Sequence, residues 1–315
     1  MNNMFMDVLI EKIKTCNNPT VAGLDPKIEF VPSFIIQDNY RKYGETLKGA
    51  SEAILEFNTT IIDNIYDIVP AVKPQLAYYE SFGVEGMKTF KKTVEYAHSK
   101  GLIVIADGKR NDIGSTSEAY SNAFIGETRI GIESFVPAFD ADALTVNPYL
   151  GIDGIKPFID DCEKHSKGIF VLVKTSNPSS GQLQDLVLDV GMKVYERVAD
   201  LVVEWGENLI CSYGYSSVGA VVGATWPSQA AALRRRMPNT FFLVPGYGAQ
   251  GGTSKDIAVN FNEDGLGAIV NASRSLMCAY KSATWKDQFS KFDFGKACRA
   301  EAIRMRDDIN FAIGG

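Results

Sequence analysis

Two carboxylates and a lysine, Asp107, Lys109 and Asp112, stand within six residues of one another just after the apolar stretch Gly101–Ile105. Charges are costly to place beside a core unless they are paired or used for chemistry. On an extended strand Asp107 and Lys109 project to the same face, because side chains alternate with a period of two. A surface ion pair is the simpler interpretation. The position favours a ligand site, since such sites lie at the carboxyl ends of strands in α/β proteins.

A glycine-rich segment, Gly246–Gly252, offers a second kind of chemistry. Its glycines satisfy a G-x-G-x-x-G pattern after a predicted strand, which is compatible with dinucleotide binding. That fingerprint normally opens the first βαβ unit, whereas most predicted strands precede this one. Glycine loops after the last strands of a barrel instead bind phosphate through backbone N–H groups. Arg274 can add a charge-assisted contact, so phosphate binding is favoured.

The strands that must position these residues are short runs rich in Val, Ile and Phe. Continuous apolar runs suit strands buried on both faces of a parallel sheet. Helical spacing separates them, and about eight strand–helix repeats predict a (β/α)8 TIM barrel. Periodicity alone leaves an open doubly wound sheet as the alternative. The predicted strands are Thr20–Leu24, Ile68–Lys73, Leu102–Asp107, Ala143–Asn147, Gly168–Lys174, Val218–Gly223, Thr240–Pro245 and Ala268–Asn271.

One domain over residues 1–315 is the better prediction, because no linker or low-complexity segment interrupts the repeats. An amphipathic helix is expected over Met1–Thr15, and a helical segment at the C-terminus. The connectors Asp25–Glu45 and Thr175–Val190 are rich in Pro, Asn, Ser and Gly, which predicts loops over the mouth of the barrel.

Seven of the predicted strands end in polar residues, although strand positions inside a barrel are expected to be apolar. These ends meet at one edge of the sheet and so predict a single site. They carry Asp25, Lys73, Asp107 with Lys109, Asn147, Lys174–Asn177, Gly246–Gly252 and Asn271–Arg274.

The composition argues against several classes of function. The net charge of −6 gives no electrostatic case for nucleic acid, and the cluster Arg234–Arg236 is interpreted as a solvated helix end. No apolar run approaches membrane-spanning length. Five scattered cysteines favour a reduced, cytoplasmic protein. The two histidines, His98 and His165, have no metal-site spacing, so lysines and carboxylates must carry any acid–base work.

The segment Asp107–Thr116, with its D-x-K-x-x-D-I pattern, resembles the signature of the orotidine 5′-phosphate decarboxylase family. Asp25 in Gly23–Pro26, Lys73, Lys174–Pro178, Pro245–Gly252 and Ser273-Arg274 extend the resemblance in the family's order. The length and the long connectors are similar to the family's larger bacterial branch.

The resemblance implies a barrel that dimerises with active sites at the interface, and conversion of orotidine 5′-monophosphate to UMP and CO2 without a cofactor or metal. Lys73, Asp107, Lys109 and Asp112 would form a charged tetrad, with Asp112 supplied by the neighbouring subunit. Asp25 and the neighbour's Thr116 would hold ribose hydroxyls, and Ser176 the pyrimidine. Gln250 and Arg274 would bind the phosphate, with Pro245 and Gly251 counted among the substrate-binding residues.

Two rival functions remain at this point. Magnesium-dependent hexulose-phosphate synthases and ketogulonate-phosphate decarboxylases share the D-x-K-x-x-D pattern, but they resemble each other in having a metal-ligating Glu at the end of strand two. This chain has Lys73 there. A non-catalytic sensor of nucleotide phosphates is the other rival, and binding alone would not require both lysines and both aspartates.

Overall fold

Eight parallel strands close into a barrel in the computed structural model, which describes residues 4–248 and 251–314. Around the barrel their order is β1-β10-β9-β8-β7-β6-β3-β2, and each strand pairs with its neighbours in parallel. The prediction of a (β/α)8 barrel is therefore confirmed, and the open sheet is excluded. The strands are β1 (Thr20–Leu24), β2 (Ala71–Pro74), β3 (Ile103–Arg110), β6 (Ala143–Val146), β7 (Gly168–Lys174), β8 (Ser216–Val222), β9 (Thr240–Pro245) and β10 (Ala268–Ala272).

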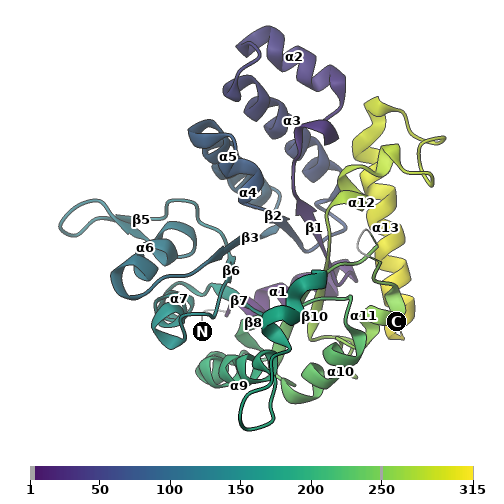
Figure 1. Ribbon diagram of the computed structural model, residues 1–315. Coiled ribbons are helices and arrows are strands. Elements are labelled where there is room, and N and C mark those ends of the chain that lie inside the picture. The colour runs from purple at the N-terminus through teal and green to yellow at the C-terminus, as the bar shows by residue number, and fades with distance from the viewer. Residues whose placement is uncertain (1–3, 249–250, 315) are drawn as a thin grey trace.

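Helices follow the strands and surround the barrel (Figure 1). The longer ones are α3 (Leu47–Ile65), α5 (Gly83–Ser99), α6 (Gly114–Phe124), α7 (Ile152–His165), α9 (Val194–Gly206), α10 (Pro227–Arg236) and α13 (Phe294–Ile313). Shorter helices lie in the connections: α4 (Ala77–Glu80), α8 (Gly181–Gln184), α11 (Ser254–Ala258) and α12 (Arg274–Met277). Single 3-10 turns occur at Ile28–Phe30, Pro178–Ser180, Glu207–Leu209, Ala279–Lys281 and Lys291–Asp293.

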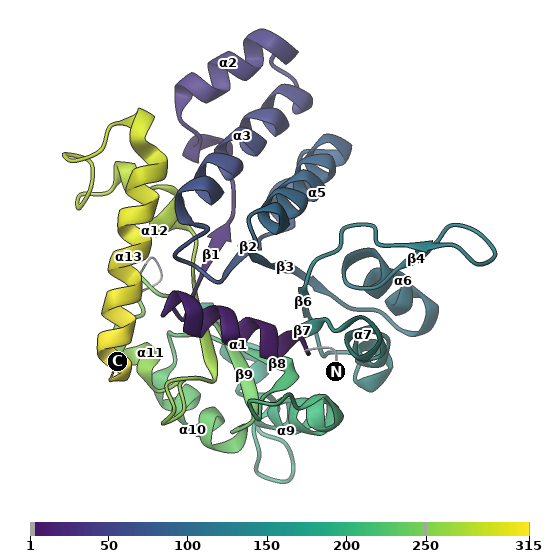
Figure 2. The same cartoon turned by 180° about the vertical axis from the view of Figure 1, so that it is seen from behind.

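The first helix, α1 (Phe5–Cys16), lies across one end of the barrel (Figure 2). Its apolar side chains join the cluster that fills the barrel interior. Phe5 meets the ring of Phe170 edge to face, with centroids 6.3 Å apart. A Cβ at Gly168 would lie only 2.2 Å from the Phe5 ring, so glycine is needed where the strand begins. The helix expected over Met1–Thr15 corresponds to α1, which begins at Phe5, while residues 1–3 lie outside the described residues. α1 covers the end of the barrel remote from the strands' carboxyl ends.

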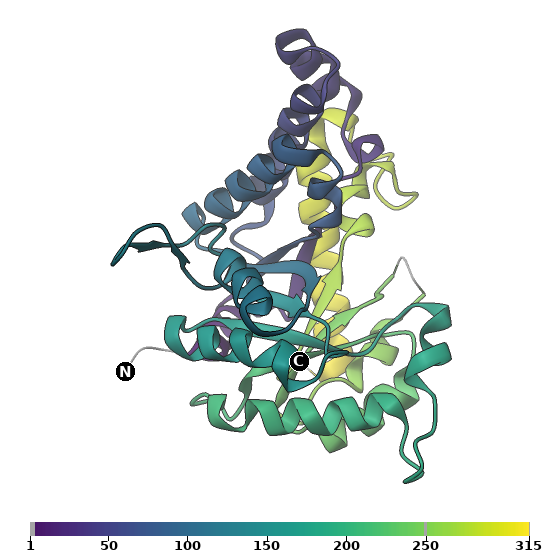
Figure 3. The ribbon, with the colours of Figure 1, turned by 60° about the vertical axis from the view of Figure 1, so that its left-hand side comes forward.

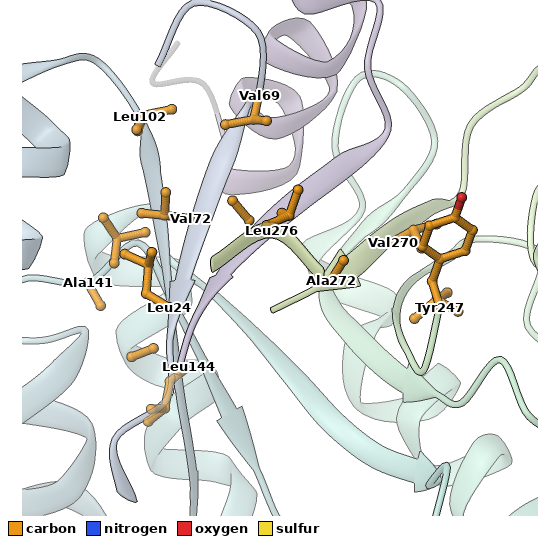
Figure 4. Close-up of a cluster of buried hydrophobic side chains, with 14 of the residues drawn as sticks. Leu24, Val69, Val72, Leu102, Ala141, Leu144, Tyr247, Val270, Ala272 and Leu276 are labelled. Carbon is orange, nitrogen blue, oxygen red and sulfur yellow. The ribbon is translucent and has the colours of Figure 1, made fainter. Parts of the chain in front are cut away.

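A second apolar cluster lies between the strands and the surrounding helices, where Leu24, Val72 and Leu144 are completely buried (Figure 4). Both faces of the barrel strands are thus covered. This double burial explains the continuous apolar runs in the sequence.

The strand predictions are accurate except at some ends. The bounds of β1, β7 and β9 are those expected. β2 begins at Ala71 rather than Ile68, because the N–H groups of Ile68 and Val69 still bond to the carbonyl of Ile65 at the end of α3. A short antiparallel hairpin, β4 (Thr128–Arg129) with β5 (Phe135–Val136), was not expected; it extends outward beyond α6 (Figures 1 and 3).

The expectation that Asp25–Glu45 is a loop is wrong, since it contains the helix α2 (Ser33–Tyr43). Ile35 is buried, and Asn39 donates to Glu56 on α3 at 2.8 Å. The second connector, Thr175–Val190, includes a 3-10 turn and α8. In the first connector Pro26 and Pro32 precede α2, so they do not interrupt the helical residues that follow.

The interpretation of Arg234–Arg236 as a solvated helix end is wrong for Arg234, which is buried. Its guanidinium donates to the carbonyls of Met237, Thr240, Gly267 and Asn260. Its charged carbon lies 4.0 Å from the centroid of the Phe242 ring. Arg234 therefore ties the end of α10 to the starts of neighbouring strands.

No helix among residues 4–248 and 251–314 has both the length and the apolar character needed to cross a membrane.

Candidate active site

A cleft of about 710 Å³ opens at the carboxyl ends of the barrel strands. Most of the polar strand ends identified in the sequence face it, so the prediction that they share one site is supported by their placement. The predicted residues that line it are Asp25, Lys73, Asp107, Lys109, Ser176, Pro245 and Arg274.

The carboxylate of Asp107 is the centre of a charged cluster at the bottom of the cleft. Lys73 Nζ lies 2.6 Å from Asp107 Oδ2, and Lys109 Nζ lies 2.6 Å from Oδ1. Two neutral donors complete the arrangement: Gln75 Nε2 lies 3.0 Å from Oδ2, and the Thr145 hydroxyl 2.9 Å from Oδ1. Each carboxylate oxygen therefore accepts from one ammonium and one neutral donor. These four donors hold the carboxylate of Asp107 in one orientation and suit its ionised form.

The two lysines differ in exposure, which separates their possible roles. The Lys73 side chain is 4% exposed, whereas that of Lys109 is 46% exposed and stands in the open cleft. A reacting group placed in the cleft can therefore reach Lys109. Lys73 can act on such a group mainly through its charge.

The backbone of β3 changes course at this cluster. Lys109 has φ of 49°, in the left-handed region that side chains other than glycine rarely adopt. The register of β3 against β6 shifts between Ala106 and Arg110, so β3 bulges there. A non-glycine residue in this conformation costs about 1–3 kcal/mol and persists only when its surroundings require it. The bulge, rather than simple alternation along a strand, aims Lys109 at Asp107.

The electrostatics of the cluster favour its charged form. Burial opposes ionisation of Asp107, but Lys73 and Lys109 overcome it and hold the pKa of this carboxyl well below its usual range. Burial likewise opposes the charge on Lys73, yet Asp107 and Asp25 raise the pKa of its ammonium. Both members of the buried pair are therefore charged at neutral pH.

Asp25 and Asn271 bring unused acceptors to the cleft. Asp25 Oδ1 and Asn271 Oδ1 are buried and have no hydrogen-bond partner in the described part of the chain. Burial raises the pKa of Asp25, although the ammonium of Lys73 partly offsets it. A Cβ at Gly23 would lie 2.0 Å from Ser273 Oγ, so only glycine lets β1 approach β10 here. Two neighbouring acceptors without donors suit a ligand that carries hydroxyl groups.

The opposite side of the cleft holds the residues expected to bind phosphate. Pro245 and Gly246 line it at the end of β9, and Gly246 has φ of 107°. Gly251 follows in the same loop with φ of 94°, and Gln250 lies outside the described residues. Arg274, at the start of α12, is exposed and lines the cleft. This side therefore presents a cation next to a glycine-rich turn.

Ser176 lies in the cleft wall after β7, and the preceding lysine fixes the segment that carries it. Lys174 is completely buried, and its Nζ donates to Asp185 at 2.9 Å. Trp226 Nε1 donates to the carbonyl of Thr175 at 3.0 Å. Lys174 therefore belongs to the support of the Ser176 segment and not to the cleft itself.

Three predicted site residues in the described part of the chain do not line the cleft: Asp112, Thr116 and Gly251. Gly251 still belongs to the glycine-rich loop after β9, whereas Asp112 and Thr116 lie elsewhere. Asp112 follows β3 and its Oδ1 accepts from the N–H of Ile113 at 2.8 Å, while Thr116 is exposed on α6. Their expected place in a neighbouring subunit's site stays a prediction.

Sequence reasoning missed two polar residues that bind Asp107: Gln75 and Thr145. Gln75 lies two residues after Lys73, so alternation beyond the end of β2 could have found it. Thr145 is a lone hydroxyl inside the apolar run Ala143–Val146. What the sequence lacks is a sign that Thr145 faces a bulge.

A closed parallel barrel with a charged cleft at the carboxyl ends of its strands defines the class of (β/α)8-barrel enzymes. Residues 46–286 match the model of the orotidine 5′-phosphate decarboxylase / HUMPS family. The chain belongs to this family.

Relatives and solved structures agree with that assignment. The chain is 44% identical to orotidine 5′-phosphate decarboxylase of Caldicellulosiruptor bescii, over 98% of this chain and 99% of the relative. It is 42% identical to the Rhodopirellula baltica enzyme of that name, over 92% and 93%. The structure of Leishmania donovani OMP decarboxylase superposes with a TM-score of 0.71 at 27% identity, covering 99% of both chains. These similarities group the chain with the decarboxylases of the family.

Proposed function

We propose that this chain converts orotidine 5′-monophosphate to UMP and CO2, the last step of pyrimidine nucleotide synthesis, with Lys109 as the proton donor. The observation that carries the mechanism is Asp107 held at 2.6 Å by both Lys73 and Lys109 at the bottom of an open cleft. The decarboxylase relatives, 44% identical over nearly the whole chain, support the reaction itself.

The chemistry requires a fixed positive charge at the reacting carbon. When the C6–carboxylate bond breaks, its electron pair stays on C6, and no adjacent carbonyl delocalises it fully. The ammonium of Lys109 stabilises this charge as it develops and then gives its proton to C6, which leaves UMP and a neutral amine. Water restores the proton to the amine before the next turnover.

Asp107 and Lys73 prepare Lys109 for this step. Asp107 orients the Lys109 ammonium, and because the pKa of Asp107 is low, this carboxylate does not compete with C6 for the proton. Lys73 compensates the buried charge of Asp107 and adds positive potential near C6.

The remaining residues bind the parts of the substrate that do not react. Asp25 takes ribose hydroxyls, consistent with its unused buried oxygen. Ser176 contacts the pyrimidine, and Arg274 with Pro245, Gln250 and Gly251 binds the phosphate. Binding energy from this remote phosphate serves the chemical step.

The active unit is a homodimer that completes each site. Asp112 and Thr116 lie outside the cleft of their own chain, and the apolar side chains of Ile113 and Ile152 beside them are 55% and 45% exposed. A second copy packed there would bury these side chains and bring Asp112 to its cleft.

Mixing two inactive variants tests this arrangement. Lys109→Ala and Asp112→Asn homodimers should each be inactive. If Asp112 acts across the interface, each mixed dimer holds one site with neither change, and random mixing restores about one quarter of the wild-type activity. No recovery in verified mixed dimers would place Asp112 in its own subunit's site.

We further propose that residues 1–315 form one domain that works in the cytoplasm. α1 contributes to the barrel interior, so the N-terminal segment is part of the barrel. All five cysteines are free, which suits a reducing compartment.

The decisive assay follows the ultraviolet change of orotidine 5′-monophosphate with purified protein in EDTA. Turnover in EDTA is expected, because Lys73 occupies the strand end where the sugar-phosphate rivals carry a metal-ligating Glu. Turnover only after magnesium is added would favour those rivals, and tight binding without turnover would favour a sensor.

A further inference from the structure

We infer that Thr145 is a positioning residue for the proton donor, an inference that rests on the proposed decarboxylation. Thr145 is 1% exposed, on β6, and one edge of its side chain reaches the cleft. It is the one neighbour whose single polar atom is bonded to both Asp107 and the backbone of Lys109 in the described chain.

The register of the sheet explains why a hydroxyl is needed here. Ala106 pairs with Leu144, and the next pair is Arg110 with Val146. Asp107, Gly108 and Lys109 therefore stand opposite the single residue Thr145. Lys109 has no partner residue in this register, and its N–H donates to the Thr145 side chain instead of to a ladder carbonyl.

Thr145 Oγ1 replaces the missing partner and thereby fixes the direction of its own proton. The Lys109 N–H donates to Oγ1 at 2.9 Å, so the hydroxyl proton is free to donate to Asp107 Oδ1 at 2.9 Å. The Lys109 ammonium donates to that same oxygen at 2.6 Å. Backbone, hydroxyl, carboxylate and ammonium thus form a closed ring through Lys109.

This ring links the unusual backbone of Lys109 to the position of its ammonium. Without the hydroxyl, the Lys109 N–H loses its acceptor while φ is 49°, and Asp107 Oδ1 loses a donor. Oδ1 would then depend more on the Lys109 ammonium, which must leave it to protonate C6. Thr145 should accordingly affect the chemical step and leave phosphate and ribose binding intact.

The experiment compares Thr145→Val, Thr145→Ser and the matched control Thr20→Val. Thr20 is also 1% exposed in a barrel strand, at the opposite end of the barrel. We expect kcat to fall about 10- to 100-fold in Thr145→Val while KM and the Kd for UMP change less than about threefold. Thr145→Ser retains the hydroxyl and should recover most of kcat, and Thr20→Val should equal the wild type.

Several outcomes would overturn the inference: an unchanged kcat in Thr145→Val, a loss that appears in KM alone, or a Ser variant as slow as the Val variant. An equal loss in Thr20→Val would mean that any buried threonine matters. If Thr145→Val does not fold, Thr145→Ala against Thr145→Ser makes the same comparison. Wild-type protein without decarboxylase activity would instead contradict the proposed function.

Discussion

Lys109 Nζ lies 2.6 Å from Asp107 Oδ1 although the backbone between the two residues does not follow a regular strand. The bulge in β3 turns Lys109 so that its ammonium meets the carboxylate while about half of its side chain stays accessible from the cleft. An undistorted strand would place two long polar side chains on one face without defining where they meet. The local distortion thus gives the Lys109 ammonium the fixed direction that the proposed proton transfer requires.

The proton-donor role predicts that Lys109→Ala lowers kcat by at least about 10⁴-fold, because both charge stabilisation and the proton are lost. Binding of UMP should persist, since the phosphate and ribose contacts remain. Lys92→Ala is the control: Lys92 is half-exposed on α5 and pairs with Glu52. Substantial residual turnover in Lys109→Ala would rule out Lys109 as the acid.

The phosphate role of Arg274 predicts that Arg274→Ala raises KM about 10- to 100-fold through the loss of a charge-assisted contact. Calorimetry with UMP and with uridine separates this role from general damage to the cleft. The affinity for UMP should fall by a similar factor, whereas the affinity for uridine, which has no phosphate, should not change. An unchanged KM would refute the assignment.

Asp25 has a buried oxygen without a partner in the described part of the chain, so we expect its carboxylate to lower the stability of the ligand-free protein while it serves substrate binding. Burial raises the pKa of Asp25, so the folded protein accepts its proton more readily than the unfolded chain does. Stability associated with Asp25 is therefore complete below pH about 4 and is lost as the pH rises. Asp25→Asn should raise the Tm of the ligand-free protein at pH 7 by about 1–3 °C, and the gain should vanish near pH 4.

Asp185→Asn provides a control of opposite sign. The Lys174 ammonium beside Asp185 lowers the pKa of that carboxyl, so its contribution exists above pH about 4 and is lost on acidification. This variant should lower Tm at pH 7, because it leaves the completely buried Lys174 without its charge partner. Asp25→Asn should also raise KM. A Tm for Asp25→Asn equal to that of the wild type at every pH would mean that the buried charge of Asp25 does not destabilise the folded protein.

The barrel could be predicted from the sequence because strands that are buried on both faces appear as continuous apolar runs. The segments Val21–Leu24 and Ile169–Val173 are apolar, and the strands β1 and β7 that contain them have the predicted bounds. The helix α2 was not predicted because only one narrow side of it is covered, where Ile35 and Asn39 are buried. Periodicity is weak when few residues of a helix reach the core.

Site residues can be predicted from the sequence where a position at the end of a strand is enough to bring them together, as for Asp25, Lys73 and Asp107. They cannot be predicted where a side chain of one strand contacts a bulge in the neighbouring strand. Nothing in the run Ala143–Val146 indicates that Thr145 faces three residues of β3. Interactions that depend on register and bulges require coordinates, because a shift of one residue exchanges the two faces of a strand.

Arg234 shows the same limit for a structural residue and leads to the last prediction. Burial lowers the pKa of Arg234 to about 10, so it stays charged at pH 7 and relies on four backbone carbonyls for compensation. Arg234→Met removes those donors and should destabilise the protein by about 3 kcal/mol, measured by urea unfolding, with kcat unchanged. The neighbouring exposed Arg235, changed to Met, should alter stability by less than about 0.5 kcal/mol. Equal effects of the two substitutions would show that the buried bonds of Arg234 contribute no more than a surface charge.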